Sequence, residues 1–352
     1  MRLKLFAAML FGLLISPMQQ AAAWNDVGHM TVAKLAWDRL SVAQRDAVFE
    51  TLGQLPHVDR FLAEHPKPVM VNEKEWLFVI SASWPDWIKE FKNAGGKNGP
   101  PLDDVAKDLK AEHVEGYHFI DVPYFFPSKQ AFAGHDPKEE TITIVGALDK
   151  VIPDVLKNGN PANRAVHVCW LLHCTGDIHQ PLHCATLFSN DYLKGDMGGN
   201  HCLVKHQGKP INLHAFWDDR LGSFTKSEGP KGAAVYYEKV YKQLLTNKEI
   251  LSRDEFNREK FATRLQLPKA SQWAEECHAI AVKTAYKDGT LPRHAFLTRF
   301  PTPMDNQMAP DLESVAGYAD DALRVASEQA ALGGYRLSDQ LDRYFPSKNG
   351  NP

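Results

Sequence analysis

The sequence lacks any long apolar run beyond its first two dozen residues, and it has little surplus charge of either sign. No later stretch approaches the roughly 20 apolar residues that a transmembrane helix needs, which argues against a stable association with a membrane. The formal net charge is −3, so the chain as a whole has no positive field that would attract a polyanion. Any affinity for nucleic acid must come from a local site.

Cysteine is also scarce, and no two cysteines have the CxxC spacing of a thiolate zinc site. The chain has five: Cys169, Cys174, Cys184, Cys202 and Cys277. In an exported protein this number predicts up to two disulfides and one leftover thiol, while the connectivity stays open.

The first residues have the pattern of a secretory signal peptide. Basic Arg2 and Lys4 precede an apolar run over 5–15, and alanines fill 21–23. We therefore expect residues 1–23 to be removed on export, which leaves a mature chain that begins at Trp24 in a periplasmic or secreted protein. Loss of the two basic residues takes the formal charge from −3 to about −5.

Long alternating runs typical of β-strands are scarce, whereas apolar residues recur at helical spacing over six segments. These segments are 28–52, 141–158, 162–180, 231–246, 256–286 and 311–343. One helix has clear ends, because Asn160 can cap it, Pro161 suits its first position and Pro181 disrupts any continuation. We predict a mainly α protein with a helix from 162 to about 179.

Two stretches rich in Gly, Asn and Pro, 91–108 and 189–200, predict surface loops. Neither an internal repeat nor a shift in composition marks a linker between domains. We expect a single domain over 24–345 that acts as a monomer, with a disordered tail over 346–352.

Two His–Asp pairs have a spacing that lets both side chains reach one cation. His173 and Asp177 lie four residues apart on the predicted helix, and His214 and Asp218 repeat the interval. One such pair is weak evidence, because a surface hydrogen bond explains it equally well. Two pairs with His183 nearby favour a metal site.

Six short motifs resemble those of a known family. They are WNDVGH (24–29), ASWPD (82–86), YHFIDVP (117–123), HCTGDIHQPLH (173–183), GDMGGN (195–200) and NLHAFWD (212–218). In this order they resemble the zinc-dependent single-strand nucleases of the S1/P1 type, which are related in fold to zinc-dependent phospholipase C. The resemblance implies a mainly α, single-domain fold of this kind around a site with three Zn2+ ions.

The resemblance also implies a ligand set for each ion. One ion would be held by Asp86, His118, His173 and Asp177; a second by His183, His214 and Asp218; and a third by the amine and carbonyl of Trp24, by His29 and by a bridging Asp177. Imidazole nitrogen and carboxylate oxygen are ligands that zinc accepts. Three zinc ions bring six positive charges against three carboxylates, so the cluster would carry about three positive charges.

The implied reaction is hydrolysis of single-stranded DNA and RNA to 5′-phosphate products, with 3′-nucleotides as further substrates. A zinc-bound hydroxide would attack phosphorus in line, at a centre to which Asp86 contributes, and Lys89 would neutralise charge on the pentavalent phosphorus. Phe119 could stack a base, while Asp121 and Asn200 could hydrogen-bond to it.

Other interpretations stay open. Lys89 could be an ordinary exposed lysine and Phe119 an ordinary core residue. A zinc phospholipase C would have the same kind of cluster but needs an apolar approach for acyl chains, and no amphipathic membrane-docking segment stands out. A non-catalytic periplasmic zinc-binding protein would need neither ligands from five separate segments nor a basic residue beside them. Turnover would distinguish binding from catalysis.

Overall fold

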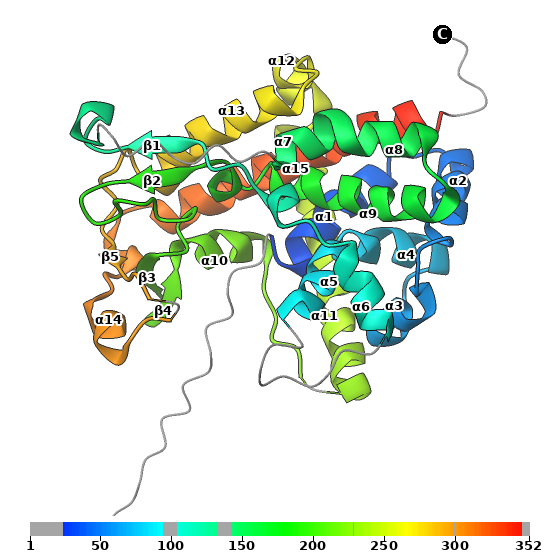
Figure 1. The fold of residues 1–352 in the computed structure, drawn as a ribbon, viewed down its shortest axis with the longest axis horizontal. Helices are drawn as coiled ribbons and strands as arrows, with labels where there is room; N and C mark the ends of the chain where they lie inside the picture. The colour runs from blue at the N-terminus through cyan, green and yellow to red at the C-terminus, as the bar shows by residue number, and fades with distance from the viewer. Residues whose placement is uncertain (1–23, 94–103, 133–141, 228, 299, 347–352) are drawn as a thin grey trace, which may run out of the picture.

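Helices make up most of the chain in a computed structural model, which describes residues 24–93, 104–132, 142–227, 229–298 and 300–346 (Figure 1). The prediction of a mainly α fold is confirmed. No helix among these residues is both long and apolar enough to span a bilayer. The predicted signal peptide and nearly all of the predicted tail lie outside the described residues, as does the middle of the loop predicted over 91–108.

The first half of the chain contributes α1 (Asp26–Trp37), α2 (Val42–Leu52), α3 (Val58–Glu64), α4 (Glu73–Ser81), α5 (Trp84–Asn93), α6 (Asp104–Ala111), α7 (Ile144–Gly146), α8 (Ile152–Asn158) and α9 (Pro161–Asp177). The second half contributes α10 (Leu213–Asp218), α11 (Gly229–Ile250), α12 (Ala262–Leu265), α13 (Ala270–Ile280), α14 (Pro303–Met308) and α15 (Tyr318–Tyr344).

Short strands lie together at one end of the molecule (Figure 1). β1 (Pro123–Phe125) pairs in parallel with β2 (Thr186–Phe188), and β3 (Cys202–His206) lies between β4 (Lys209–Asn212) and β5 (His294–Ala295) in antiparallel order. The predicted loop over 189–200 joins β2 to β3.

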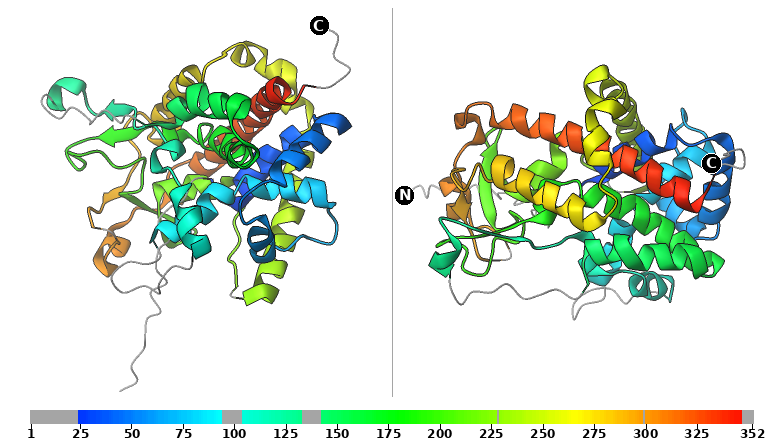
Figure 2. Two further views of the ribbon diagram at one scale, coloured as in Figure 1. Left: turned by 45° about the vertical axis from the view of Figure 1, so that its right-hand side comes forward. Right: turned by 90° about the horizontal axis from the view of Figure 1, so that it is seen from above.

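Helix α1 lies at the centre of the helical part and packs against α4, α9, α11 and α15. Every residue from Val27 to Trp37 is buried, as expected for a helix that other helices surround. Its one lysine, Lys34, is buried with its ammonium paired to Asp38 and Glu75. The long helix α15 runs along the molecule (Figure 2) and has its most extensive contact with α1.

Helix α9 begins where the sequence predicts. The Asn160 side chain accepts a hydrogen bond from the Asn163 N–H at 2.9 Å, and Pro161 occupies the first helical position. The helix ends at Asp177, two residues earlier than expected, and Pro181 opens a 3-10 turn over Pro181–Cys184. This turn carries one of the predicted metal ligands.

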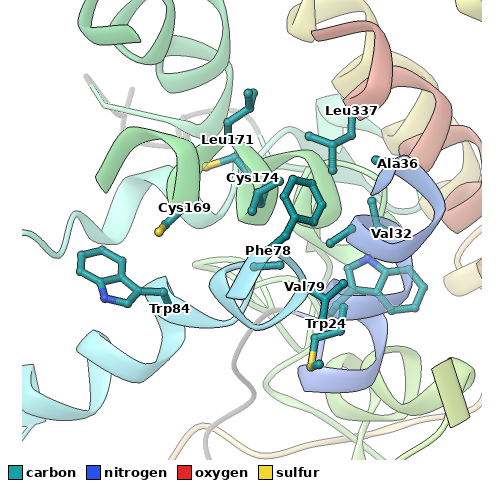
Figure 3. Close-up of a cluster of buried hydrophobic side chains, with 14 of the residues drawn as sticks. Trp24, Val32, Ala36, Phe78, Val79, Trp84, Cys169, Leu171, Cys174 and Leu337 are labelled. Atoms are coloured by element: carbon teal, nitrogen blue, oxygen red, sulfur yellow. The ribbon is translucent and has the colours of Figure 1, made fainter. Parts of the chain in front are cut away.

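A buried cluster joins Trp24, the predicted mature N-terminus, to the helices around it (Figure 3). The Trp24 indole is fully buried, beside Val32 of α1 and Val79 of α4. The first residue of the predicted mature chain is therefore part of the core.

The prediction of disulfides is wrong in this structure, since all five cysteines are buried and unpaired. Two of the thiols bond to backbone carbonyls instead: Cys174 Sγ donates to Tyr117 O at 3.2 Å and Cys184 Sγ to Ile178 O at 3.6 Å. Burial raises the pKa of both thiols well above the usual value. They pack as small apolar side chains.

Candidate metal centre

Eight predicted ligand side chains converge where α1, α5, α9, α10 and two 3-10 turns meet. Their donor atoms form three groups in which all atoms lie within 4.8 Å of one another: His29, His173 and Asp177; Asp86, His118 and His173; and His183, His214 and Asp218. All eight belong to motifs that predicted a metal site. The structure thus brings together every predicted ligand side chain except that of Trp24, for which a main-chain role is expected.

Asp177, at the end of α9, lies between two of these groups. Its Oδ2 is 3.0 Å from His173 Nε2 and 3.3 Å from His118 Nδ1, while its Oδ1 is 3.3 Å from His29 Nε2. Both oxygens are buried, and neither has a hydrogen-bond partner among the described residues. One carboxylate can therefore bridge two cations.

Asp86 approaches the same two groups from α5. Its Oδ1 lies 3.9 Å from His118 Nδ1 and from His173 Nε2, and its Oδ2 lies 4.0 Å from His29 Nε2. Burial raises the pKa of Asp86 to about 6. The carboxyl is therefore protonated more easily than that of an exposed aspartate, because burial disfavours its charged form when no metal ion offsets that cost.

Backbone carbonyls orient three of the histidines. The Nδ1 atoms of His173, His183 and His214 lie 2.8, 2.5 and 2.7 Å from the carbonyl oxygens of Ala82, His118 and Gly198 respectively. Each Nδ1 must donate a proton to its carbonyl, which leaves Nε2 as the atom that can bind a metal. The Nε2 atoms of His183 and His214 are only 3.1 Å apart, as two ligands of one cation would be.

Electrostatics favours neutral imidazoles here. Burial lowers the pKa of His29 to about 4 and that of His214 to about 3. Burial alone would lower the pKa of His173, but the adjacent carboxylates of Asp177 and Asp86 outweigh this effect and raise the pKa. His173, His183 and His29 together hold the pKa of Asp177 well below its usual value, despite burial. Most of the histidines are thus in the form that binds a metal.

Gln180 is a functional residue that the sequence analysis missed. Its Nε2 donates to Asp218 Oδ1 at 2.8 Å, which leaves Asp218 Oδ2 facing His214 Nε2 at 3.7 Å. Its Oε1 accepts the Leu182 N–H. Gln180 lies within the HCTGDIHQPLH motif, but only the fold reveals its contact with Asp218, a predicted ligand whose carboxylate it orients.

Two glycines permit the close approach of ligands. A Cβ at Gly176 would lie 2.7 Å from His29 Nδ1, so the absence of a side chain lets the His29 ring rest on α9. Gly198 has φ 61°, and a Cβ there would collide with the Leu182 carbonyl oxygen. Its backbone conformation favours glycine, and its own carbonyl orients His214.

Asp196 is a second residue that the sequence analysis missed. Its buried carboxylate accepts hydrogen bonds from the Leu187 N–H at 2.8 Å and from the Tyr286 hydroxyl at 3.0 Å. These contacts fix the loop that carries Gly198. Asp196 therefore supports His214 through the backbone of that loop.

Lys89 lies one helical turn after Asp86, and its side chain is 25% exposed. Its ammonium is 3.9 Å from the Glu115 carboxylate and lies near enough to lower the pKa of Asp86. Phe119, Asp121 and Asn200 are each half-buried, and the Asn200 amide donates to Met197 O at 2.9 Å. Roles for these four residues stay predictions.

A helical fold that gathers imidazoles and carboxylates into three groups able to hold metal ions is typical of a metal-dependent hydrolase. Residues 24–346 match the S1/P1 Nuclease family, and the chain belongs to that family. It is a nuclease, a hydrolase that acts on phosphodiester bonds, and the family is zinc-dependent. This confirms the predicted family and enzyme class.

Three relatives show how far the similarity extends. The chain is 22% identical to Endonuclease 3 of Arabidopsis thaliana over 342 residues, which cover 93% of this chain and 91% of the relative. It is 24% identical to Endonuclease 4 of the same plant over 344 residues, with 93% and 91% covered. It is 23% identical to Nuclease S1 of Aspergillus oryzae over 328 residues, with 92% of each covered.

Proposed function

We propose that this nuclease is an exported enzyme with three zinc ions that cuts single-stranded DNA and RNA, leaves 5′ phosphates and also acts on 3′-nucleotides. The observation that carries the proposal is the position of Asp177, whose two oxygens face separate groups of imidazoles. A third group around His214 lies beside them. Such an arrangement suits a multi-metal phosphoryl site.

The donor set fits zinc. Imidazole nitrogens and carboxylate oxygens are its usual ligands beside thiolates, and no cysteine belongs to the three groups among the described residues. Both nitrogens of His29 and both oxygens of Asp177 are buried, and none of the four atoms has a hydrogen-bond partner among the residues that the structure describes. Leaving such atoms unsatisfied costs about 1–3 kcal/mol each, and a cation bound to Asp177 and to His29 Nε2 would offset that cost for the atoms that it contacts.

Each zinc ion has a ligand set in this proposal. Asp86, His118, His173 and Asp177 hold the first ion; His183, His214 and Asp218 hold the second; and the Trp24 amine and carbonyl, His29 and Asp177 hold the third. Burial of the Trp24 indole supports the third set, because it fixes the residue whose backbone would provide two ligands.

Bound zinc lowers the pKa of a coordinated water to about 7 and polarises the phosphoryl oxygen. The Lys89 ammonium then stabilises the negative charge that builds up on the phosphoryl oxygens as the P–O bond to the 3′ oxygen breaks. Phe119 stacks on one base, and Asp121 and Asn200 hydrogen-bond to its edge. A base can stack in this way only when it is unpaired, which explains a preference for single strands.

Export completes the site, because the Trp24 α-amine exists only after cleavage behind residue 23. In the precursor the same nitrogen belongs to an amide, whose lone pair is delocalised and cannot bind zinc normally. The enzyme is therefore inactive in the cell that makes it and becomes active in the periplasm or outside the cell.

The test compares a mature protein that starts at Trp24 with the same protein preceded by one methionine. We expect three zinc ions per chain and cleavage of a single-stranded oligonucleotide to 5′-phosphate ends in the first, but two zinc ions and almost no cleavage in the second. Equal zinc content and equal rates would exclude the terminal ligand. Release of a phosphorylated headgroup from phospholipid vesicles, without cleavage of the oligonucleotide, would instead indicate a phospholipase C.

A further inference from the structure

We propose that Asn25 is the positioning residue that holds the mature N-terminus at the third zinc site, by anchoring it to the turn just beyond Asp218. This inference rests on the proposed role of the Trp24 backbone as a ligand. It assigns a function to the second residue of the mature chain, a residue that is not itself a ligand.

The Asn25 side chain uses both of its polar atoms. Its Oδ1 accepts a hydrogen bond from the Gly28 N–H at 3.2 Å and so caps α1. Its Nδ2 donates to Asp219 Oδ1 and to Gly222 O, both at 2.8 Å. The first contact is local, whereas the other two join segments that are almost 200 residues apart in sequence.

These two segments carry ligands of different zinc ions in the proposed set. Trp24 immediately precedes Asn25, and Asp218 immediately precedes Asp219. One amide group therefore ties the backbone of the third site to the end of α10, which carries two ligands of the second site. Gln180 holds Asp218 independently, so the end of α10 serves as the fixed point and the terminus is the part that the Asn25 amide positions.

An anchor of this kind is needed because chain termini normally fray. A ligand distance has to be held to about 0.2 Å for a metal site to keep its geometry. The buried Trp24 indole fixes one side of the terminus, where a Cβ at Gly28 would lie 2.5 Å from the ring. Asn25 fixes the other side by holding the backbone that leads from Trp24 into α1.

The two roles of Asn25 can be separated by one substitution. Asn25→Asp keeps an oxygen that can cap α1, since aspartate is as good an N-cap as asparagine. It removes both Nδ2 hydrogen bonds and places a carboxylate against that of Asp219. Helix α1 should therefore persist while the anchor is lost.

The experiment measures zinc content and zinc affinity of mature proteins that start at Trp24, by metal analysis and by titration against a competing chelator. We expect Asn25→Asp to weaken the binding of one of the three zinc ions by about 10–100-fold, the range for loss of a residue that orients a ligand. The affinity for the other two ions should stay unchanged. Excess zinc should restore cleavage. The matched control is Asn160→Asp, which changes the cap of α9 in the same way at a residue with no such anchor.

A double variant keeps the test informative if the single variant folds poorly. In Asn25→Asp/Asp219→Asn, a donor and an acceptor exchange places, so the hydrogen bond between positions 25 and 219 can form again. We expect this variant to regain part of the lost zinc affinity. Asp219→Asn alone should not bind zinc more tightly than the unsubstituted protein does.

The outcomes are distinct. If the unsubstituted mature protein binds fewer than three zinc ions or does not cut, the proposed function fails. If it binds three and cuts, but Asn25→Asp binds all three as tightly, the anchor is wrong. Equal weakening of all three ions, or no recovery in the double variant, would also overturn it, because Asn25 would then contribute only general stability.

Discussion

Replacing Gly176 by alanine should weaken zinc binding by moving the His29 ring. The new Cβ would lie 2.7 Å from His29 Nδ1 and 3.2 Å from its Cε1. Favourable contacts between such atoms begin near 3.5 Å, so the ring has to retreat by about 0.8 Å. Metal–ligand distances tolerate only about 0.2 Å. His29 therefore cannot keep its place in the third site.

The effect on stability should be much smaller than the effect on zinc. Overpacking typically costs about 1–3 kcal/mol, but alanine inside a helix is better than glycine by about 1 kcal/mol. The free energy of unfolding of the metal-free protein should thus fall by about 0–2 kcal/mol. Loss of a residue that only orients a ligand weakens metal binding by about 10–100-fold. Because this substitution displaces a ligand itself, zinc affinity at the third site should fall by at least that much.

The assay combines chelator titration of the mature protein with urea unfolding of its metal-free form. Gly333→Ala is the matched control, because it makes the same change inside α15, where the new Cβ would lie at an ordinary 3.4 Å from the His179 ring and from Val32. We expect the control to bind three zinc ions normally. Normal zinc affinity in Gly176→Ala would refute the argument from close approach.

Four further predictions test other parts of the site. Asp177→Asn should lower bound zinc and abolish cleavage while circular dichroism still shows a helical protein, because both of its oxygens face ligand groups. Lys89→Ala should reduce kcat by about 100-fold with zinc content unchanged; a rise in KM alone would make Lys89 a ground-state contact. Asp196→Ala should weaken one zinc ion, measured by chelator titration, because the loop that orients His214 loses two hydrogen bonds. Zinc uptake by metal-free protein should release more protons per chain at pH 5 than at pH 7, measured in weakly buffered solution. Asp86, with a pKa of about 6, holds a proton at pH 5 that zinc must displace, whereas His29, with a pKa of about 4, is already neutral at both pH values.

Local chemistry explains what the sequence predicts well. The start of α9 depends on Asn160 and Pro161, which act on the backbone of their own turn, so a local pattern is sufficient. The ligand types and the i,i+4 pairs His173–Asp177 and His214–Asp218 are equally local. The structure brings each pair to the centre that the motifs predict.

Residues that act across the fold escape such an analysis. Gly176 matters because α1 packs against α9, and Gln180 matters because α10 places Asp218 beside it. Neither contact has a spacing in sequence that would reveal it. The prediction for the cysteines failed for the same reason: the count predicts disulfides, but all five thiols are free and buried in the fold, where Cys174 finds a carbonyl partner.

Backbone carbonyls, rather than carboxylates, orient three of the imidazoles, and this choice affects the charge of the centre. A carbonyl fixes the tautomer of His173, His183 or His214 without adding a negative charge. In the proposed ligand set, three carboxylates face the six positive charges of three zinc ions, so about three positive charges remain. Carboxylate partners at the same three histidines would reduce that sum to about zero. With that ligand set, a chain with a net charge of −3 would attract a polyanion at one place, which is where the proposed reaction requires the scissile phosphate.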